Sequence, residues 1–488
     1  INNIDNILNL FVHGHDQAKQ QVKRVLGQWI NGNNSKGYCL GFEGPPGVGK
    51  TTLAKEGLTM LLKDIDGTNR PFSMIQLGGD SNGSSLHGHN YTYVGSTWGS
   101  IVQILMDKKC MNPIILIDEV DKISKTEHGR EIVGILTHIL DPTQNDCFQD
   151  KYFSGVEIDL SKVLFILSYN NASEIDSILL DRVHRIHFSS LSLEEKIHIS
   201  RTYVLPELYK KFGIESSIIF SDETLELLIT NYTCEPGIRK LKEIFYVIIG
   251  EITLQYLKED NTVDITEEIK YDDIVNHYIP DKIPIIHQKI HEDDTVGMVN
   301  CLYATTSGHS GILAATSKFI YSDKKFDLKL TGLLDDMMRE SFAISFTLAF
   351  NLLDLDRKEE LTKIYETTKC TGIHMHMGDG SINKSGTSAG IAISVLMYSI
   401  LSNKKIKHDF AITGEAADLR GKVGEIGALK YKFIGGIRAG VKNFIFPENN
   451  MHDYNMFMKK YKDNKLIEGI SFYPVKDLSQ VIELIIVK

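Results

Sequence analysis

The segment Gly44–Thr51 reads GPPGVGKT and matches the pattern G-x-x-x-x-G-K-[ST] of a phosphate-binding loop. It follows a short apolar run and opens a helical pattern, which is the context that this loop requires. The glycines let the backbone curl around an anion, and N–H groups near the helix start point at the phosphates. The lysine supplies a positive charge to the β- and γ-phosphates, and the threonine hydroxyl can bind Mg²⁺. The residues that we expect to hold a nucleotide here are Gly44, Pro45, Pro46, Gly47, Val48, Gly49, Lys50, Thr51 and Thr52.

An acidic pair follows the buried strand that is predicted at Ile114–Ile117. Asp118 can hold the magnesium ion together with the loop threonine, and Glu119 can polarise the water that attacks the γ-phosphate. A further apolar run, Leu164–Leu167, leads to Asn170, which would lie beside the γ-phosphate if the two strands are neighbours. An asparagine at the end of a strand can equally serve a turn, and that alternative stays open.

A second site with chemical potential is the segment Gly386–Gly390, which reads GTSAG and precedes an apolar helical pattern. Ser388 would lie near the N-terminus of that helix, where backbone N–H groups can bind an oxyanion. Its small neighbours would keep the hydroxyl accessible. Serine at the start of a helix is more often only a cap, so position alone does not decide between the two roles.

A serine nucleophile needs a base, and Lys432 is the candidate on the helix predicted after Ile426. Ala428, Gly435 and Gly436 lie on the same helical face, and we expect these small residues to let another helix approach and bury the amine. Burial lowers the pKa of a lysine from its usual value of about 10.4, as a lysine base requires. A solvated lysine on an amphipathic helix is the competing interpretation.

Apolar periodicity along the chain indicates an α/β part, a helical part and a second α/β part. Short apolar runs alternate with helical patterns from Gly37 to about Phe188, which is typical of a parallel sheet covered on both faces. A purely helical stretch begins with a capping box at Ser192 and Glu195. We therefore expect a nucleotide-binding domain over 1–189, an all-α domain over 190–275, a linker over 276–294 and a further domain over 295–488.

Composition excludes several classes of protein. The 488 residues are 42% hydrophobic and 24% charged, as in ordinary globular proteins, and their net charge of −10 argues against nucleic acid as the main partner. Six single cysteines without metal-site spacing are typical of reduced intracellular thiols. No apolar stretch reaches the length of about 18 residues that a membrane span needs. His374 and His376 alternate on a predicted strand, but without a third ligand we interpret them as core or surface histidines.

The residues of the first site together resemble the AAA+ ATPases. The resemblance implies that Asn170 is sensor 1, that Arg182 is the arginine finger acting in trans, and that Arg239 is sensor 2 in a helical lid. It also implies that His13 and Gly14 line the adenine pocket, and that the chain forms a homohexameric ring around its substrate. From the residues alone, both arginines could equally be solvated surface charges.

The last part of the chain resembles the Lon protease domain. The matching segments, in order, are Thr331–Gly332, Met338–Ser341, Ile373–His376, Ser388–Gly390, Thr413–Glu415, Leu419–Gly421 and Phe446–Asn449. In Lon the nucleophile is the serine of this S-A-G and the base is the second lysine of the later motif. The resemblance therefore implies Ser388 and Lys432 as a catalytic dyad, with Thr413 as the hydroxyl that supports the lysine.

The serine loop departs from the Lon pattern. Lon usually reads P-K-D-G-P-S-A-G, whereas here Ser385 replaces the acid and Thr387 replaces the proline. Met377–Gly378 also stands where Val-Pro is usual. Because the dyad itself is intact, we expect activity, with altered loop order and regulation.

The segment His89–Ser96, which reads HNYTYVGS, resembles the loop that Lon-type proteases project into a central pore. The resemblance implies that Tyr93 and Val94 grip a substrate chain, since an aromatic contact tolerates any sequence. The alternative is an aromatic residue on a half-buried strand.

We expect an AAA+ P-loop parallel sheet domain with an all-α lid, followed by an α+β Lon-type protease domain. The function that this implies is an ATP-dependent serine endopeptidase, using ATP and Mg²⁺, that unfolds and translocates unfolded or damaged proteins. The runner-up is a non-proteolytic AAA+ unfoldase or chaperone with an impaired peptidase site, and a nucleic-acid motor is the third reading. We further expect a soluble intracellular protein of the cytoplasm or the mitochondrial matrix. Because the chain starts at Ile1, we expect it to lack the N-terminal substrate-binding domain of Lon.

Overall fold

The computed structural model describes residues 2–31, 39–63, 67–78, 83–213, 218–258, 268–305, 309–378, 384, 386–462 and 465–487. The chain divides into two compact units, Ile1–Pro284 and Ile285–Lys488. Their division lies within residues 276–294, which the sequence suggests as a linker, and the finer domain boundaries stay a prediction. Among the described residues, no helix combines the length and the apolar character needed to span a bilayer.

The first unit contains a five-stranded sheet in which every strand runs parallel to its neighbours, in the order β2-β3-β4-β1-β5. The strands are β1 (Cys39–Glu43), β2 (Phe72–Gln76), β3 (Ile114–Asp118), β4 (Leu164–Tyr169) and β5 (His184–His187). The central strands are buried on both faces, which explains why their sequences are continuous apolar runs rather than alternating ones.

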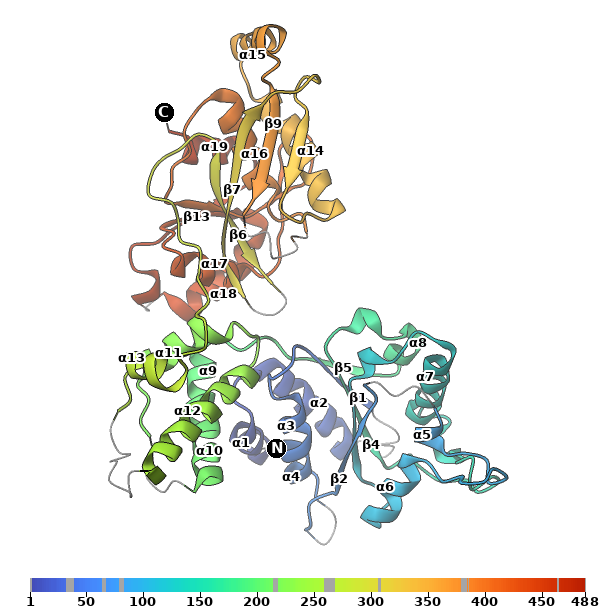
Figure 1. The fold of residues 1–488 in the computed structure, drawn as a ribbon. Helices are drawn as coiled ribbons and strands as arrows, with labels where there is room; N and C mark the ends of the chain where they lie inside the picture. Colours follow the sequence, from blue (N-terminus) through green and yellow to red (C-terminus); the bar gives the residue numbers. More distant parts are fainter. Residues whose placement is uncertain are drawn as a thin grey trace. The chain divides into compact units, whose positions relative to one another are not determined.

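Helices cover both faces of this sheet, as Figure 1 shows. On one side lie α1 (Asn2–Phe11), α2 (Asp16–Asn31), α3 (Lys50–Thr52) and α4 (Thr59–Leu61). On the other lie α5 (Ser84–His87), α6 (Ser100–Lys108), α7 (Glu127–Leu140) and α8 (Ser177–Asp181). Alternate residues of β3 enter the two cores, Leu116 packing in the core that holds Leu53 and Ile117 in the core that holds Ile132. The predicted parallel sheet with both faces covered is confirmed.

The rest of the first unit is a helical part with its own apolar core. Its helices are α9 (Leu193–Ile199), α10 (Leu205–Phe212), α11 (Asp222–Leu228), α12 (Arg239–Lys258) and α13 (Tyr271–Asp273). The predicted capping box starts α9, because Glu195 N donates to Ser192 Oγ (3.3 Å) and Ser192 N donates to Glu195 Oε2 (2.7 Å). The buried carboxylate of Glu235 accepts from Lys240 N and Leu241 N and so caps α12.

The second unit contains a seven-stranded mixed sheet in the order β14-β13-β10-β6-β7-β9-β8, together with a separate two-stranded sheet. Strands β6–β7 and β7–β9 pair antiparallel, and the other pairs of the large sheet are parallel. The strands are β6 (Met298–Ala304), β7 (Ser310–Ile320), β8 (Leu328–Thr331), β9 (Gly372–Met377), β10 (Phe410–Ile412), β11 (Glu415–Ala416), β12 (Val423–Gly424), β13 (Asn443–Pro447) and β14 (Ser471–Val475).

Two apolar cores fill the space between this sheet and its helices. The helices are α14 (Asp336–Asn351), α15 (Leu355–Thr368), α16 (Gly390–Ser402), α17 (Leu429–Arg438), α18 (Met451–Tyr461) and α19 (Leu478–Ile485). The helix α16 is buried along nearly its whole length, as its mostly apolar sequence predicts. Figure 1 shows α17 and α18 at the opposite end of this unit from α15.

An aromatic cluster holds α17 against the sheet. The ring centroid of Phe433 lies 4.8–5.4 Å from those of Phe444, Phe446, Phe457 and Phe472, in T-shaped contacts. Phe433 is fully buried. Because its ring is the common member of these four contacts, the orientation of α17 depends on it.

We expect Phe433→Ala to lower the free energy of unfolding of the second unit by about 3–5 kcal/mol, because it leaves a cavity in the aromatic cluster. Denaturant titration of the whole chain measures this. Met456→Ala, on the exposed face of α18, is the control and should change stability by less than about 0.5 kcal/mol. Equal stability of the two variants would contradict the anchoring role.

Candidate active sites

The loop after β1 forms a cradle at the carboxyl edge of the first sheet. Gly47 and Gly49 have φ angles of +75° and +100°, in the left-handed region that favours glycine. A cavity of about 720 Å³ opens above the loop. The predicted nucleotide-site residues that line it are His13, Pro46, Gly47, Val48, Gly49, Lys50, Thr51, Thr52, Asp118, Glu119, Asn170 and Arg239. Gly14, Gly44, Pro45 and Arg182 are not among its lining residues.

The amine of Lys50 lies at the bottom of the cavity, and the residue is only 8% exposed. Its Nζ donates to the carbonyl oxygens of Gly44 and Tyr169 (3.0 Å to the latter) and to Asn170 Oδ1 (2.8 Å). Burial lowers the pKa of Lys50 to about 8, against the opposing pull of nearby carboxylates, chiefly Asp118. Binding a polyphosphate beside this amine would favour its charged form.

The end of β3 places two carboxylates on the rim of the same cavity. Asp118 Oδ1 accepts from the backbone N–H of Glu119 (2.9 Å), and the side chains of both residues line the cavity. Asp118 and Thr51 offer oxygen donors of the kind that Mg²⁺ prefers. The chemistry of these two side chains therefore fits the cation that the sequence predicts.

The two asparagines after β4 have separate roles. Asn170 turns its amide oxygen to Lys50, whereas the side chain of Asn171 accepts from Ser173 N (3.0 Å) and closes the turn. Asp121 Oδ2 accepts from both backbone N–H groups, at 3.1 and 3.2 Å. Of the two interpretations of Asn170, the geometry favours the one that puts its side chain in the nucleotide cavity.

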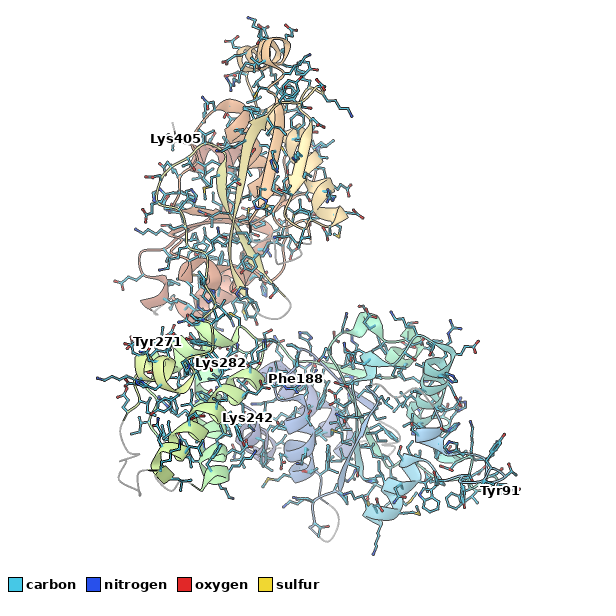
Figure 2. All side chains as sticks on the ribbon, in the orientation of Figure 1. Tyr91, Phe188, Lys242, Tyr271, Lys282 and Lys405 are labelled. Carbon is cyan, nitrogen blue, oxygen red and sulfur yellow. The ribbon has the colours of Figure 1, made fainter. Side chains whose placement is uncertain are left out.

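The helical part closes the cavity through a direct backbone contact. Ile238 N donates to the carbonyl oxygen of Gly47 (3.2 Å), and a Cβ on Gly237 would overlap the backbone of Gly47. This contact brings Arg239, the first residue of α12, into the cavity lining. Sequence reasoning missed other lining residues from this part, because only tertiary packing brings them to the loop: Leu191, Ile199, Thr202, Tyr203, Val204, Glu207, Ile238 and Lys242. Figure 2 labels one of them, Lys242, in the helical part of the first unit.

Of the two residues predicted at the adenine pocket, His13 lines the cavity and Gly14 does not. The ring of His13 lies 3.9 Å from that of His198, centroid to centroid, and His13 lines the cavity. Burial lowers the pKa of His13, and the neighbouring His198 lowers it further. Gly14 instead packs against the carboxylate of Glu195, which a Cβ at this position would approach to 2.8 Å.

Arg182 lies outside the cavity of its own chain. Its Nε and Nη2 donate to Asp141 Oδ2 at 3.2 and 3.0 Å, and its Nη1 donates to the carbonyl oxygen of Ile178 (3.1 Å). The guanidinium is thus held at the end of α8 by an ion pair with the residue that follows α7.

The segment that resembles a pore loop is an exposed turn rather than a strand. Tyr93 is 67% exposed and Val94 is fully exposed. Tyr93 N donates to Asn90 O and Ser96 N donates to Tyr93 O, both at 3.1 Å, and Gly95 has a φ of +83°. Figure 2 shows Tyr91 at the outer end of this turn. The half-buried strand interpretation of Tyr93 is therefore wrong.

A residue that sequence reasoning missed anchors the base of this turn. The fully buried carboxylate of Asp150 accepts from the backbone N–H groups of Gly99 and Tyr152, both at 2.8 Å. The rings of Trp98, Tyr152 and Phe153 pack together beside it. These buried contacts therefore hold the base of the exposed turn in place.

In the second unit, Ser388 lies two residues before α16, close to the helix N-terminus as predicted. Its carbonyl oxygen accepts from Gly414 N (2.8 Å) and from Thr413 Oγ1 (3.3 Å). The same Thr413 hydroxyl accepts from Lys432 Nζ at 2.9 Å. Thr413 therefore connects the predicted serine and the predicted lysine.

Lys432 is 4% exposed, and burial lowers its pKa to about 8. The interpretation as a solvated surface lysine is therefore wrong. The expected neighbour of α17 was a second helix, but Gly435 packs on the backbone of Ser310 and Gly311 in β7, and Gly436 packs on Phe444 and Leu302. The small residues let a sheet, rather than a helix, approach the amine-bearing helix.

The remaining predictions of the second unit concern the histidines and the serine loop. His374 Nε2 and His376 Nδ1 lie 3.1 and 2.9 Å from the hydroxyl of Thr331, which links them across β8 and β9. Within the part of the chain that the structure describes, no cluster of metal ligands includes either ring. Of the two unusual loop residues, Thr387 accepts from Gly390 N through its carbonyl (3.0 Å), and Ser385 lies outside the described residues.

Comparison with known proteins matches both units. The model of the "ATPase family associated with various cellular activities (AAA)" matches residues 40–191, and that of the "Lon protease (S16) C-terminal proteolytic domain" matches residues 271–488. A Lon protease of Campylobacter jejuni is 37% identical over 88% of this chain and 53% of its own length. A Lon protease of Finegoldia magna is 31% identical over 99% of this chain and 59% of its own length. A Lon protease homolog of Acanthamoeba polyphaga mimivirus is 32% identical over 99% of this chain and 51% of its own length.

The chain spans about half the length of the curated relatives it matches. An AAA domain with a phosphate-binding loop precedes a proteolytic domain in which a buried lysine is joined to a serine through Thr413. Residues 40–191 therefore belong to the AAA family of ATPases and residues 271–488 to the family of the Lon protease (S16) proteolytic domain.

Proposed function

We propose that this chain is the ATP-hydrolysing and peptide-cleaving core of an ATP-dependent serine endopeptidase. The observation that carries the proposal is the pair of hydrogen bonds from Lys432 to Thr413 and from Thr413 to the backbone carbonyl of Ser388, in the same chain as the nucleotide cavity. A lysine with a pKa of about 8 that is hydrogen-bonded to a hydroxyl beside a serine has the features of a general base.

In the proposed cleavage, Ser388 Oγ attacks the carbonyl carbon of a substrate peptide bond while its proton passes to the neutral amine of Lys432. The C–N bond then breaks, the proton moves from Lys432 to the leaving amine, and an acyl-enzyme ester remains. Water then attacks that ester and gives a proton to Lys432. The ester C–O bond breaks, the acid product leaves, and Lys432 returns the proton to Ser388 Oγ. Backbone N–H groups close to Ser388 are proposed to stabilise the oxyanion that forms in this step.

In the proposed ATP reaction, the loop N–H groups and Lys50 hold the phosphates, and Glu119 orients the attacking water. Mg²⁺, held by Thr51 and Asp118, would neutralise charge on the β- and γ-phosphates. Asn170 and Arg239 line the same cavity and are proposed as the two sensors. Arg182 is fixed away from its own cavity by Asp141, which supports an action on the ATP of a neighbouring subunit in a homohexameric ring.

The exposed turn at Tyr93 and Val94 is proposed to grip unfolded or damaged protein substrates inside that ring. Its base is held by Asp150, which would keep the turn attached to the body of the first unit while it contacts a substrate. Pulling by many such contacts would unfold the substrate before it meets Ser388. In this arrangement, specificity comes from unfolding rather than from the cleavage site.

We expect Ser388→Ala to abolish degradation of casein while leaving ATP hydrolysis unchanged, because the nucleophile is lost and the nucleotide cavity is untouched. Casein proteolysis and phosphate release measure the two activities. Ser402→Ala, at the other end of α16, is the matched control and should degrade casein normally. If the unmodified chain hydrolyses ATP but never degrades casein, the non-proteolytic unfoldase is the correct interpretation.

We expect Glu119→Gln to bind ATP with an unchanged Kd and to hydrolyse it about 100-fold or more slowly, because the group that activates water is lost. Degradation of folded substrates should stop with it. Glu127→Gln, in the first turn of α7, is the control. Continued processive degradation of a folded protein by Glu119→Gln would count against coupling to ATP hydrolysis.

We expect cleavage of a short unstructured peptide to rise with pH around the Lys432 pKa of about 8, since only the neutral amine can take the serine proton.

The lowered pKa of Lys432 also makes the stability of the chain depend on pH. Because the pKa of Lys432 falls from 10.5 to about 8 on folding, the unfolded state binds more protons between these values, and stability rises with pH across them.

Lys432→Met should remove that rise, so its stability advantage over the unmodified chain should be largest below pH 8 and vanish near 10.5. Both proteins retain Lys50, whose pKa is lowered similarly, so the comparison isolates Lys432. Denaturant unfolding at a series of pH values measures it. A pH-independent difference between the two proteins would mean that Lys432 is not buried as an amine.

A further inference from the structure

Glu119 occupies a constrained position at the end of β3. Its φ angle is +59°, in the left-handed region that a residue with a side chain seldom adopts. Its N–H donates to Asp118 Oδ1, and two residues later Asp121 ties the same turn to the backbone of Asn170 and Asn171. The backbone of Glu119 is therefore fixed from both sides, and the direction of its side chain depends on the space around it.

The space that the Glu119 side chain occupies lies against Gly78. Strand β2 pairs with β3 so that Gln76 lies opposite Asp118, and Leu77 N donates to Asp118 O (3.2 Å). This register brings Gly78 beside the Glu119 side chain. A Cβ on Gly78 would overlap Glu119 Oε2 and would lie 2.9 Å from Cδ and 3.4 Å from Cβ.

We propose that Gly78 is a positioning residue for ATP hydrolysis. Because it has no side chain, there is room at the cavity rim for the Glu119 carboxylate. The proposal rests on the proposed role of Glu119 as the group that orients water. It adds a residue from outside the nucleotide motifs, two residues after the end of β2, the strand that neighbours β3.

The backbone at Gly78 does not itself require glycine. Gly78 is not among the glycines with positive φ, so alanine fits its backbone conformation, in contrast to Gly47 and Gly49. The overlapping atom belongs to the free end of a flexible side chain, so the carboxylate will move rather than the fold. A shift of roughly 1 Å or more relieves the overlap, and misplacement of that size at a catalytic group costs up to about 100-fold in rate.

The test is steady-state ATP hydrolysis together with equilibrium binding of ATP to the whole chain carrying Gly78→Ala. We expect kcat to fall by about 10- to 100-fold, with the Kd for ATP and the Tm unchanged, because Lys50 and the phosphate loop are untouched. Gly134→Ala is the matched control. It makes the same substitution on α7, where a Cβ meets open space, and it should hydrolyse ATP normally.

A double-variant comparison separates positioning from a general structural effect. The substitution Glu119→Asp shortens the side chain and withdraws the carboxylate from Gly78, so Gly78→Ala should slow the Glu119→Asp variant less than it slows the unmodified chain. Equal slowing in both backgrounds, an unchanged or raised kcat in Gly78→Ala, or a parallel loss of ATP affinity would overturn the inference. If Glu119→Gln itself hydrolyses ATP normally, the proposed role of Glu119 fails instead, and the two failures are distinguishable.

Discussion

Burial of a lysine amine is the constraint on which both sites depend. Lys50 and Lys432 lie in different units, and burial lowers the pKa of each to about 8. Their surroundings differ. Lys50 faces two carbonyl oxygens and has the carboxylates of Asp118 and Asp121 nearby, so its charge is favoured once a phosphate arrives. Lys432 donates to the neutral hydroxyl of Thr413, which suits an amine that must accept a proton. The same desolvation would thus serve the proposed anion-binding role of Lys50 in one unit and the proposed basic role of Lys432 in the other.

The first site is a consequence of parallel strands. The strands β3, β4 and β1 are neighbours and all run in the same direction, so their carboxyl ends meet at one edge. The acidic pair, Asn170 and the phosphate loop follow these three ends. Ligands bind at such an edge because loops, rather than packed side chains, surround it. The second site forms in a different way. Thr413, directly after β10, joins the loop before α16 to α17 through its hydrogen bonds with Ser388 and Lys432.

Two close contacts between segments depend on glycines, which have no side chain. Gly237 lets the helical part touch Gly47, and Gly435 lets α17 lie on β7. In each case the approach is between a backbone and another backbone, which a Cβ would prevent. The glycines of α17 can be noticed in the sequence, but what packs on them cannot. We expected a helix there and the structure has a strand, because a small residue indicates a close approach without indicating its partner.

The sequence by itself determined the reacting groups and their local setting. The segment GPPGVGKT that leads into α3, the acids at the end of β3 and the serine before α16 depend on spacing along the chain, and the structure has each where its spacing predicts. Tertiary structure alone decided what surrounds each ambiguous residue. Asn170 faces Lys50, Arg182 pairs with Asp141, Tyr93 is exposed and Lys432 is buried. These outcomes depend on contacts between segments that are far apart in the chain, and the burial of a group is a property of what surrounds it. No pattern within one segment carries that information.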